Sequence, residues 1–330
     1  MTEIRWLLVG AGDISQKRVA SALSSTQSSI ITGVCDIREE NARNLSQEVA
    51  AKEVYTEFEN ALATTSADAV YLATPVWLHA KHTLAALSAR KHVLIEKPLG
   101  LNSKESHQVV DAAERSDFRV GCAYYRRCFP RYRHAKQMLA NQEFGQIVLV
   151  RLIYHSWFDP SETDPKYWRV LRSQSGGGVL SDMGSHMFDI LIGLFGLPKS
   201  VYAKCENLVH QWDVEDCASI LMTLENGALV TASFNWNSKT WRHEFEIVGT
   251  EAKINWLPCD SGPVTKTVGR EVQELDLPNA NNVHQPIVDD FIDAILRNRD
   301  PICPVAEAAK TNILLDAVYR SAEENREISL

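Results

Sequence analysis

A glycine-rich turn near the start of the chain has the composition of a phosphate-binding loop. Residues 10–15 read Gly-Ala-Gly-Asp-Ile-Ser after an apolar run, which matches G-x-G-x-x-S, with serine where the dinucleotide-binding pattern usually has glycine or alanine. Gly10 permits a sharp turn, and Gly12 leaves room for a pyrophosphate at the N-terminus of the next helix, where aligned N–H groups favour an anion. Ser15 is small enough to pack between helix and strand. The turn predicts a dinucleotide site, although the same residues also form ligand-free turns.

An acidic residue ends the second apolar run. Asp36 lies twenty-one residues past Ser15, where a carboxylate accepts hydrogen bonds from both hydroxyls of the adenosine ribose. The same carboxylate repels a 2′-phosphate, so it favours NAD over NADP. Arg38 weakens this preference, because a guanidinium neutralises a phosphate or stacks on adenine. We expect NAD as the cofactor, with NADP less favoured.

Two more polar clusters follow buried strands. Thr74-Pro75 ends the fourth strand, and Glu96-Lys97-Pro98 ends the fifth. Ligands bind at the carboxyl ends of strands in parallel sheets, so Lys97 is expected to point into that crevice beside a nicotinamide. Taken alone, the tripeptide is more typical of a solvated ion pair between Lys97 and Glu96.

The fourth cluster follows three glycines at 176–178. Asp182 and His186 are four residues apart, so on one helix their side chains would be neighbours. A carboxylate beside a histidine fixes its tautomer and raises its basicity, as a general base requires. The alternative is an Asp182 that favours the helix dipole and a His186 that belongs to the core. A third ligand at metal-binding spacing is not evident, so we expect no metal.

Alternating strands and helices must position the first three motifs. Apolar runs rich in Val, Ile and Leu predict strands, and segments with apolar residues at helical spacing lie between them. The strands are residues 4–9, 30–36, 54–55, 69–73, 92–96 and 119–123; the helices are 15–23, 38–51, 57–63, 77–89 and 103–115. Strands buried on both faces with helical crossovers predict an α/β, doubly wound parallel sheet, a Rossmann domain over residues 1–123.

The remainder, residues 124–330, predicts an α+β domain for substrate binding and oligomerisation. Asn226-Gly227 between two apolar runs indicates a hairpin, and consecutive strands with such links indicate a large, mainly antiparallel open sheet. The strands are 146–157, 200–207, 215–225, 228–236, 242–248, 252–257, 264–267 and 272–276; the helices are 130–140, 178–193, 286–297 and 305–325. The last helix is expected to pack back on the Rossmann domain.

Composition excludes several classes of protein. The chain has 330 residues, 45% of them hydrophobic, with a net charge of −8, which disfavours a nucleic-acid surface. Its apolar stretches are shorter than the roughly 20 residues of a membrane-spanning helix, and charged residues interrupt the start before a signal peptide forms. Seven scattered cysteines without a C-x-x-C pair disfavour a disulfide framework or structural zinc. We expect a cytoplasmic protein.

The four clusters in this order resemble the glucose–fructose oxidoreductase, inositol dehydrogenase and rhizopine-catabolism (Gfo/Idh/MocA) family. The likeness spans essentially the whole chain, and the combination of Glu96-Lys97-Pro98 with a glycine run, Asp182 and His186 is specific. The resemblance implies an NAD(P)-dependent dehydrogenase or reductase that transfers a hydride between nicotinamide and a CH–OH carbon of a sugar, polyol or related cyclic alcohol.

The resemblance also implies roles for individual residues. Lys97 would hold the reacting oxygen and His186 would act as acid and base, with Asp182 orienting His186 or binding a hydroxyl. Cofactor contacts would come from Gly10, Gly12, Asp13, Ile14, Asp36, Arg38, Thr74, Pro75, His79, Glu96 and Lys97. Substrate contacts would come from Lys97, Tyr154, His155, Trp168, Arg169, Asp182 and His186.

Two other functions and an assembly are also compatible with this sequence. The family includes glycosidases that hold NAD and oxidise the sugar transiently, and regulators that sense NAD or sugars without catalysis. Regulators tend to lose the lysine or histidine, and both are present here. We expect a homodimer or homotetramer through the large sheet, because Val148, Val150 and Leu152 alternate with Ile147, Leu149 and Ile153 to make both of its faces apolar.

Overall fold

The computed structural model describes residues 3–330, which form two compact units. The N-terminal unit comprises the residues up to 128 together with 280–309, and the C-terminal unit comprises 129–279 and 310–330. Residues 280–309 therefore group with the N-terminal unit, whereas the sequence prediction assigned all of 124–330 to the second domain. No helix within residues 3–330 is long and apolar enough to cross a membrane.

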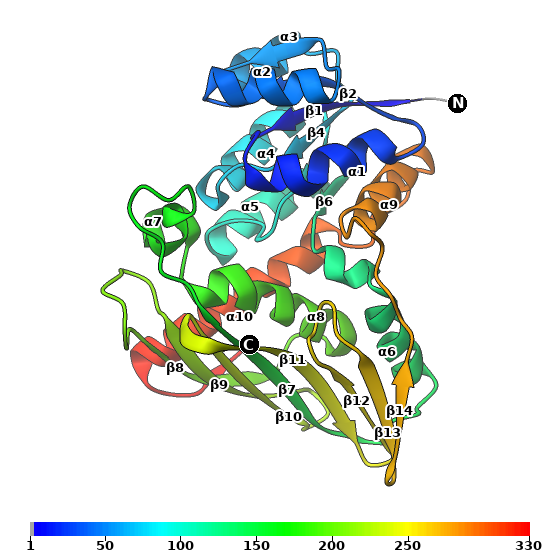
Figure 1. Ribbon diagram of the computed structural model, residues 1–330, viewed down its shortest axis with the longest axis vertical. Helices are drawn as coiled ribbons and strands as arrows, with labels where there is room; N and C mark the ends of the chain where they lie inside the picture. Colours follow the sequence, from blue (N-terminus) through cyan, green and yellow to red (C-terminus); the bar gives the residue numbers. More distant parts are fainter. Residues whose placement is uncertain (1–2) are drawn as a thin grey trace. The chain divides into compact units, whose positions relative to one another are not determined.

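A six-stranded parallel sheet forms the centre of the N-terminal unit (Figure 1). Its strand order is β3-β2-β1-β4-β5-β6, and every neighbouring pair is parallel. The strands are β1 Ile4–Val9, β2 Ser29–Cys35, β3 Glu53–Tyr55, β4 Ala69–Leu72, β5 His92–Ile95 and β6 Val120–Cys122. The order reverses between β1 and β4, the place where ligands bind in such sheets. The predicted doubly wound sheet is confirmed.

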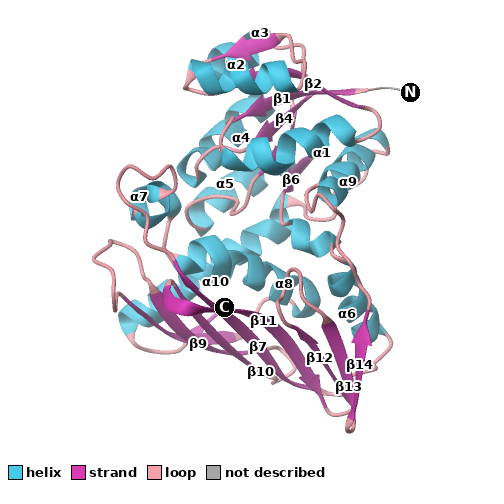
Figure 2. Cartoon of the chain, viewed as in Figure 1, coloured by secondary structure: helices cyan, strands magenta, loops and turns pink. Residues whose placement is uncertain are grey.

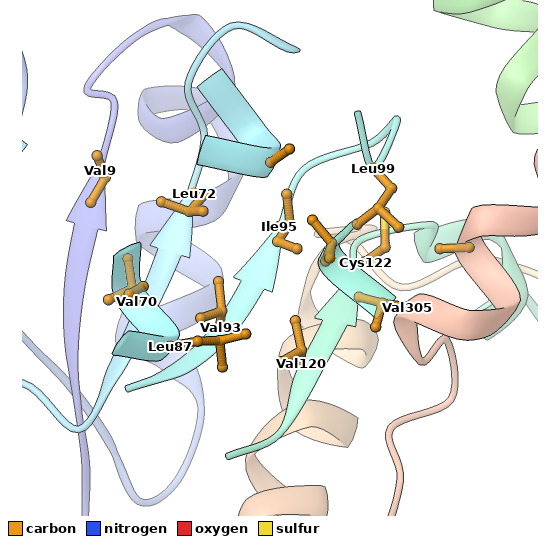
Figure 3. Packing of buried hydrophobic residues seen from close by; sticks show 14 of the residues in the cluster. Val9, Val70, Leu72, Leu87, Val93, Ile95, Leu99, Val120, Cys122 and Val305 are labelled. Atoms are coloured by element: carbon orange, nitrogen blue, oxygen red, sulfur yellow. The ribbon is translucent and has the colours of Figure 1, made fainter. Parts of the chain in front are cut away.

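Each face of this sheet has its own hydrophobic cluster. Alternate residues of β1 divide between the two: Leu7 and Val9 join one cluster, and Trp6 and Leu8 join the other. The first cluster (Figure 3) includes residues of α3 Phe58–Thr64, α4 His79–Ser88 and α5 Ser103–Glu114. The second includes residues of α1 Ala20–Ser25, α2 Glu39–Glu48 and α9 Gln285–Leu296. Burial on both faces accounts for the near-continuous apolar runs of these strands.

The helix after the glycine turn begins as a π-helical turn. Residues Ser15–Val19 are π-helical and α1 follows directly, whereas the sequence predicted one α-helix from residue 15. The Ser15 side chain is buried and donates to the carbonyl of Gly10. Ser15 thus closes the glycine turn as well as packing between helix and strand.

A nine-stranded sheet forms most of the C-terminal unit, and Figure 2 shows its strands in one layer with α6 and α8 on one side. Its order is β14-β13-β12-β11-β7-β10-β9-β8-β15, antiparallel throughout except for the pair β7 and β10. The strands are β7 Ile147–Trp157, β8 Ser200–Glu206, β9 Cys217–Thr223, β10 Leu229–Asn235, β11 Asn237–Gly249, β12 Ala252–Trp256, β13 Val264–Val268, β14 Glu271–Leu275 and β15 Ile328–Ser329. The predicted mainly antiparallel sheet is confirmed.

The C-terminal unit also contains helices and short helical turns. The helices of the C-terminal unit are α6 Pro130–Ala140, α7 Arg172–Ser175, α8 Ser185–Phe195 and α10 Val305–Glu324, with a 3-10 turn at Tyr167–Val170 and a π-helical turn at Leu180–Gly184. Residues 305–309 of α10 group with the N-terminal unit and its remainder with the C-terminal unit.

The two faces of the large sheet differ in polarity. Val150 and Leu152 of β7 are fully buried, on the face where Phe234 of β10 contacts Phe188 of α8. The opposite face carries Arg151, whose guanidinium lies 2.9 Å from the carboxylate of Glu246 in β11. The face away from α8 is therefore a mixture of apolar residues and ion pairs, and not the apolar surface expected from the alternation in β7.

Candidate functional site

The glycine turn at residues 10–15 is packed tightly at Gly10 and open at Gly12. Gly10 has a φ of +92°, and a Cβ there would lie 2.5 Å from the carbonyl oxygen of Ala73, so only glycine fits. A Cβ at Gly12 would meet no atom of residues 3–330 within 4 Å. Gln16 ties the loop down by donating to the carbonyl oxygen of Ala11 at 2.9 Å. Side-chain hydrogen bonds from Ser15 and Gln16 hold the loop, and a side chain at Gly12 would extend into open space.

Asp36 braces the same loop from the end of β2. One carboxylate oxygen accepts from the backbone N–H of Ala11 at 2.7 Å, and the other accepts from the N–H of Arg38 at 2.9 Å. The Arg38 side chain is 66% exposed, and its Nε lies 3.9 Å from the carboxylate. Ile37 between them is 87% exposed. An exposed apolar side chain and a guanidinium therefore stand beside an anchored carboxylate.

His79, the first residue of α4, joins the ends of β4 and β5. Its Nε2 lies 2.8 Å from the carbonyl oxygen of Thr74, and its Nδ1 lies 2.7 Å from that of Pro98. Burial lowers the pKa of His79, although both carbonyls favour its charged form. Both ring nitrogens are engaged by the protein itself, so His79 positions the loops at Thr74 and Pro98. The peptide bond between Lys97 and Pro98 is cis.

Glu96 is buried in a network of three side chains. Its Oε1 accepts from the hydroxyl of Tyr71 in β4 at 2.8 Å and lies 3.1 Å from Nε2 of His284, just before α9. Burial opposes ionisation, but the hydrogen bond and charge of His284, the hydrogen bond of Tyr71 and the charge of Lys97 prevail and lower the pKa of Glu96. Sequence reasoning missed Tyr71 and His284, because nothing near them in the chain suggests that they meet Glu96.

A second buried carboxylate, Glu215, holds the turn that leads to Asp182 and His186. It accepts from the backbone N–H groups of Gly178 and Leu180, each at 3.0 Å, and from the hydroxyl of Tyr319 in α10 at 3.1 Å. Burial raises its pKa against these hydrogen bonds. A Cβ at Gly178 would lie 2.0 Å from the Glu215 carbonyl oxygen, so the glycine run permits this close packing. Sequence reasoning also missed Glu215 and Tyr319.

Asp182 lies in a π-helical turn and not in the predicted α-helix. The N–H of Ser185 bonds to the carbonyl of Leu180, five residues back. The Ser185 hydroxyl donates at 2.7 Å to the carbonyl of Ser181, which the N–H of Ser185 would occupy in an α-helix. The side chain thus satisfies the carbonyl that the wide turn releases, and α8, with His186 in its first turn, begins at Ser185.

Of the predicted substrate residues, Arg169 lies beside Asp182, and Trp168 lies beside Arg169. Nε of Arg169 lies 3.6 Å from a carboxylate oxygen of Asp182. The same guanidinium lies over the ring of Trp168, 4.8 Å from its centroid. All three side chains belong to the C-terminal unit, as does the buried His186. Lys97 belongs to the N-terminal unit.

Tyr154 and His155 are consecutive residues of β7 and project to opposite faces of the sheet. Tyr154 pairs with Phe234 of β10, on the face that α8 covers. His155 shares the other face with Ser233, whose hydroxyl lies 2.8 Å from its Nε2. A ligand bound on one face of the sheet reaches only one of the two.

One cluster of potential metal ligands lies elsewhere in the C-terminal unit. Ligand atoms of His243, Cys259 and Asp260 lie within 4.8 Å of one another. Arg131 donates to the carbonyl oxygens of Cys259 at 2.6 Å and Pro258 at 3.2 Å. Because this guanidinium already brings a positive charge to the cluster, we assign no metal ion to it.

Comparison with known proteins gives matches over nearly the whole chain. Residues 4–124 match a family model described as an oxidoreductase family with an NAD-binding Rossmann fold, and residues 132–255 match the GFO/IDH/MocA C-terminal domain. Oxidoreductase P35 of Formosa agariphila is 26% identical over 320 residues, 96% of this chain and 98% of that protein. The 1,5-anhydro-D-fructose reductase of Ensifer adhaerens is 28% identical over 252 residues, 76% of this chain and 74% of that protein.

The fold is also that of a solved enzyme. The structure of levoglucosan dehydrogenase in complex with NADH superposes with a TM-score of 0.91 at 20% identity, with 99% of each chain covered. At this level of identity the likeness concerns the fold.

Proposed function

The chain belongs to the Gfo/Idh/MocA family of NAD-binding oxidoreductases, and from this premise we propose that it oxidises or reduces a CH–OH carbon of a sugar, polyol or related cyclic alcohol. The observation that carries the proposal is the open position at Gly12 beside an anchored Asp36. Free space at the turn, next to a carboxylate that anchors it, is what the pyrophosphate and the ribose of a dinucleotide require.

The residues of the N-terminal unit fit a dinucleotide. Besides the space at Gly12, the buried hydroxyl of Thr74 at the end of β4 has no hydrogen-bond partner among residues 3–330, so it is available to a ligand. NAD, when bound, supplies the hydride acceptor or donor. The residues that would hold it directly or position its loops are Gly10, Gly12, Asp13, Ile14, Asp36, Arg38, Thr74, Pro75, His79, Glu96 and Lys97. The carboxylate of Asp36, whose side chain is 10% exposed, supports NAD over NADP.

Acid–base chemistry falls to Lys97 and His186 in this proposal. Removing a hydride from a carbon that bears a hydroxyl leaves a carbonyl, so the hydroxyl proton must leave to a base. We propose that the ammonium of Lys97 binds the reacting oxygen and that His186 takes or returns the proton. Asp182, paired with Arg169, orients His186 or binds a neighbouring hydroxyl.

The substrate class rests on the side chains near Asp182 and on the relatives. A tryptophan face packs on the C–H face of a sugar ring, and Arg169, stacked on Trp168, brings hydrogen-bond donors to its edge. The similar proteins include a 1,5-anhydro-D-fructose reductase and a levoglucosan dehydrogenase, both named for anhydrosugars. We propose that Tyr154 contacts the substrate and that His155, on the opposite face of the sheet, does not.

A substrate panel tests the proposal. Hexoses, pentoses, inositols and anhydrosugars are offered with NAD and with NADP while reduced cofactor is followed by absorbance. The wild-type protein should reduce NAD with at least one of them, and Lys97→Met should lower turnover at least about a hundredfold while most of the affinity for NADH remains. The absence of turnover with every compound, or full turnover in the Lys97→Met variant, would contradict the proposal.

We further propose a homodimer or homotetramer that forms through the face of the large sheet away from α8. Tyr202, Leu221 and Leu229 are 38–46% exposed, and the register places Leu221 beside Tyr202 on this face. Light scattering after gel filtration measures the assembly directly. Elution of a 37.0 kDa species at micromolar concentration would contradict the assembly.

A further inference from the structure

His284 is a buried histidine to which the proposed reaction assigns no role. Its side chain is 0% exposed, and its Nε2 lies 3.1 Å from Oε1 of Glu96, 188 residues earlier in the chain. The ring of Tyr125 packs on the imidazole with a centroid distance of 4.6 Å. Its own backbone N–H is satisfied by the side chain of Asn282 at 3.0 Å. The imidazole is therefore held in one position against the carboxylate.

The pairing determines the tautomer of His284. Glu96 is an acceptor when ionised, so the proton of a neutral His284 must lie on Nε2. Its Nδ1 is buried and has no hydrogen-bond partner among residues 3–330. The geometry thus directs the N–H on Nε2 at the carboxylate, in the neutral and in the charged imidazole alike.

Several titratable groups face Glu96 from the elements packed around it. Tyr71 of β4 donates to the carboxylate at 2.8 Å, and the backbone N–H of Lys97 lies 3.3 Å from Oε2. The charges of Lys97 and His79 interact with it as well, and the thiol of Cys122 in β6 contacts the Glu96 carbonyl. A buried carboxylate keeps its charge only while such donors compensate for lost hydration.

We propose that His284 is a positioning residue that acts through Glu96, an inference that rests on the proposed function. By keeping Glu96 ionised beside Lys97, His284 would ensure that the lysine carries its proton when it binds the reacting oxygen. Without the imidazole N–H the carboxylate takes up a proton more readily. The ammonium of Lys97 then loses its neighbouring anion and gives up its proton at lower pH.

Three variants separate this role from simple packing. His284→Leu removes the donor, whereas His284→Gln keeps an N–H near the position of Nε2. Glu96→Gln removes the charge in nearly the same shape. NMR of protein labelled with ¹³C at the Cε of lysine follows the titration of Lys97, and its signal is assigned by its loss in Lys97→Arg. The titration should move to lower pH in His284→Leu and in Glu96→Gln, and should stay near wild type in His284→Gln.

Kinetics gives a second readout on the same variants. If a protonated Lys97 is required, kcat/KM falls as pH rises through its pKa, and this alkaline limb should move to lower pH by about one unit in His284→Leu. An unchanged limb or an unchanged Lys97 titration in the folded Glu96→Gln variant would overturn the inference. Because NMR needs no substrate, a wild-type protein without sugar turnover would instead count against the proposed function.

Discussion

The carboxylate of Asp36 lies 2.7 Å from the backbone nitrogen of Ala11, between the two glycines of the phosphate-binding turn. The residue expected to select the ribose therefore also holds the loop expected to bind the pyrophosphate. Because one oxygen of Asp36 serves Ala11 and the other serves Arg38, the cofactor preference and the shape of the loop depend on the same side chain.

Replacing Asp36 by asparagine should separate these two tasks. The amide oxygen still accepts from Ala11, while the charge that repels a 2′-phosphate is gone. We expect NADH affinity to fall about tenfold, equivalent to about 1.4 kcal/mol, and the ratio of affinities to move toward NADPH. Fluorescence titration with both cofactors measures this. An unchanged ratio of the affinities for NADH and NADPH would show that Asp36 only holds the loop and does not select the cofactor.

Alanine at the two glycines of the turn should have opposite effects. Gly12→Ala places its Cβ in open space, so the free energy of unfolding should be nearly unchanged while NADH affinity falls at least tenfold. Gly10→Ala combines a φ of +92° with a clash against Ala73 and should destabilise the unit by about 2 kcal/mol or more. Urea unfolding and NADH titration of both variants test this. Tight NADH binding by Gly12→Ala would argue against a pyrophosphate there.

Removing the buried carboxylate of Glu215 should be costly. Glu215→Ala leaves the N–H groups of Gly178 and Leu180 without their acceptor and should destabilise the protein by about 3 kcal/mol. Tyr319→Phe removes one hydrogen bond from the same carboxylate and should cost about 1 kcal/mol. Denaturant midpoints compare the two, and equal losses would mean that Glu215 does not hold the turn.

Stability should fall in mild acid because of His82. Burial, helped by the charge of Lys81, lowers its pKa from 6.5 to about 4, and its ring packs at a tilt against that of Phe58, with the ring centroids 4.2 Å apart. Below pH 6.5 the unfolded chain binds a proton at His82 that the folded protein binds only near pH 4. The free energy of unfolding should therefore fall across this interval, by about 2 kcal/mol. His79 and His92, whose pKa values are also lowered by burial, act in the same direction.

Urea unfolding at pH 7.5 and pH 5 measures this loss. His82→Leu should reduce the difference between the two values, and His107→Gln, on the exposed face of α5, is the matched control that should not. If His82→Leu kept the full pH dependence, the assignment to His82 would be wrong.

Local sequence determined the elements of the N-terminal unit and the position of its turn. Strands buried on both faces must be apolar throughout, and the helices between them must carry apolar residues at helical spacing. Both patterns can be recognised in the sequence. The glycine at position 10 is required by a backbone conformation that other residues rarely adopt. Such constraints act over a few residues, and a single sequence displays them.

Only the tertiary structure decided which side chains meet. The pairing of Glu96 with His284, and of Glu215 with Tyr319 and the glycine run, joins residues that are far apart in the chain. Consecutive positions on one strand directed Tyr154 and His155 to opposite faces, and the segment with helical spacing at Asp182 formed a π-helical turn whose released carbonyl is bonded by a serine hydroxyl. A buried carboxylate is stable only when hydrogen-bond donors surround it. The packing of elements that are distant in the chain supplies these donors, and no local sequence pattern encodes that packing.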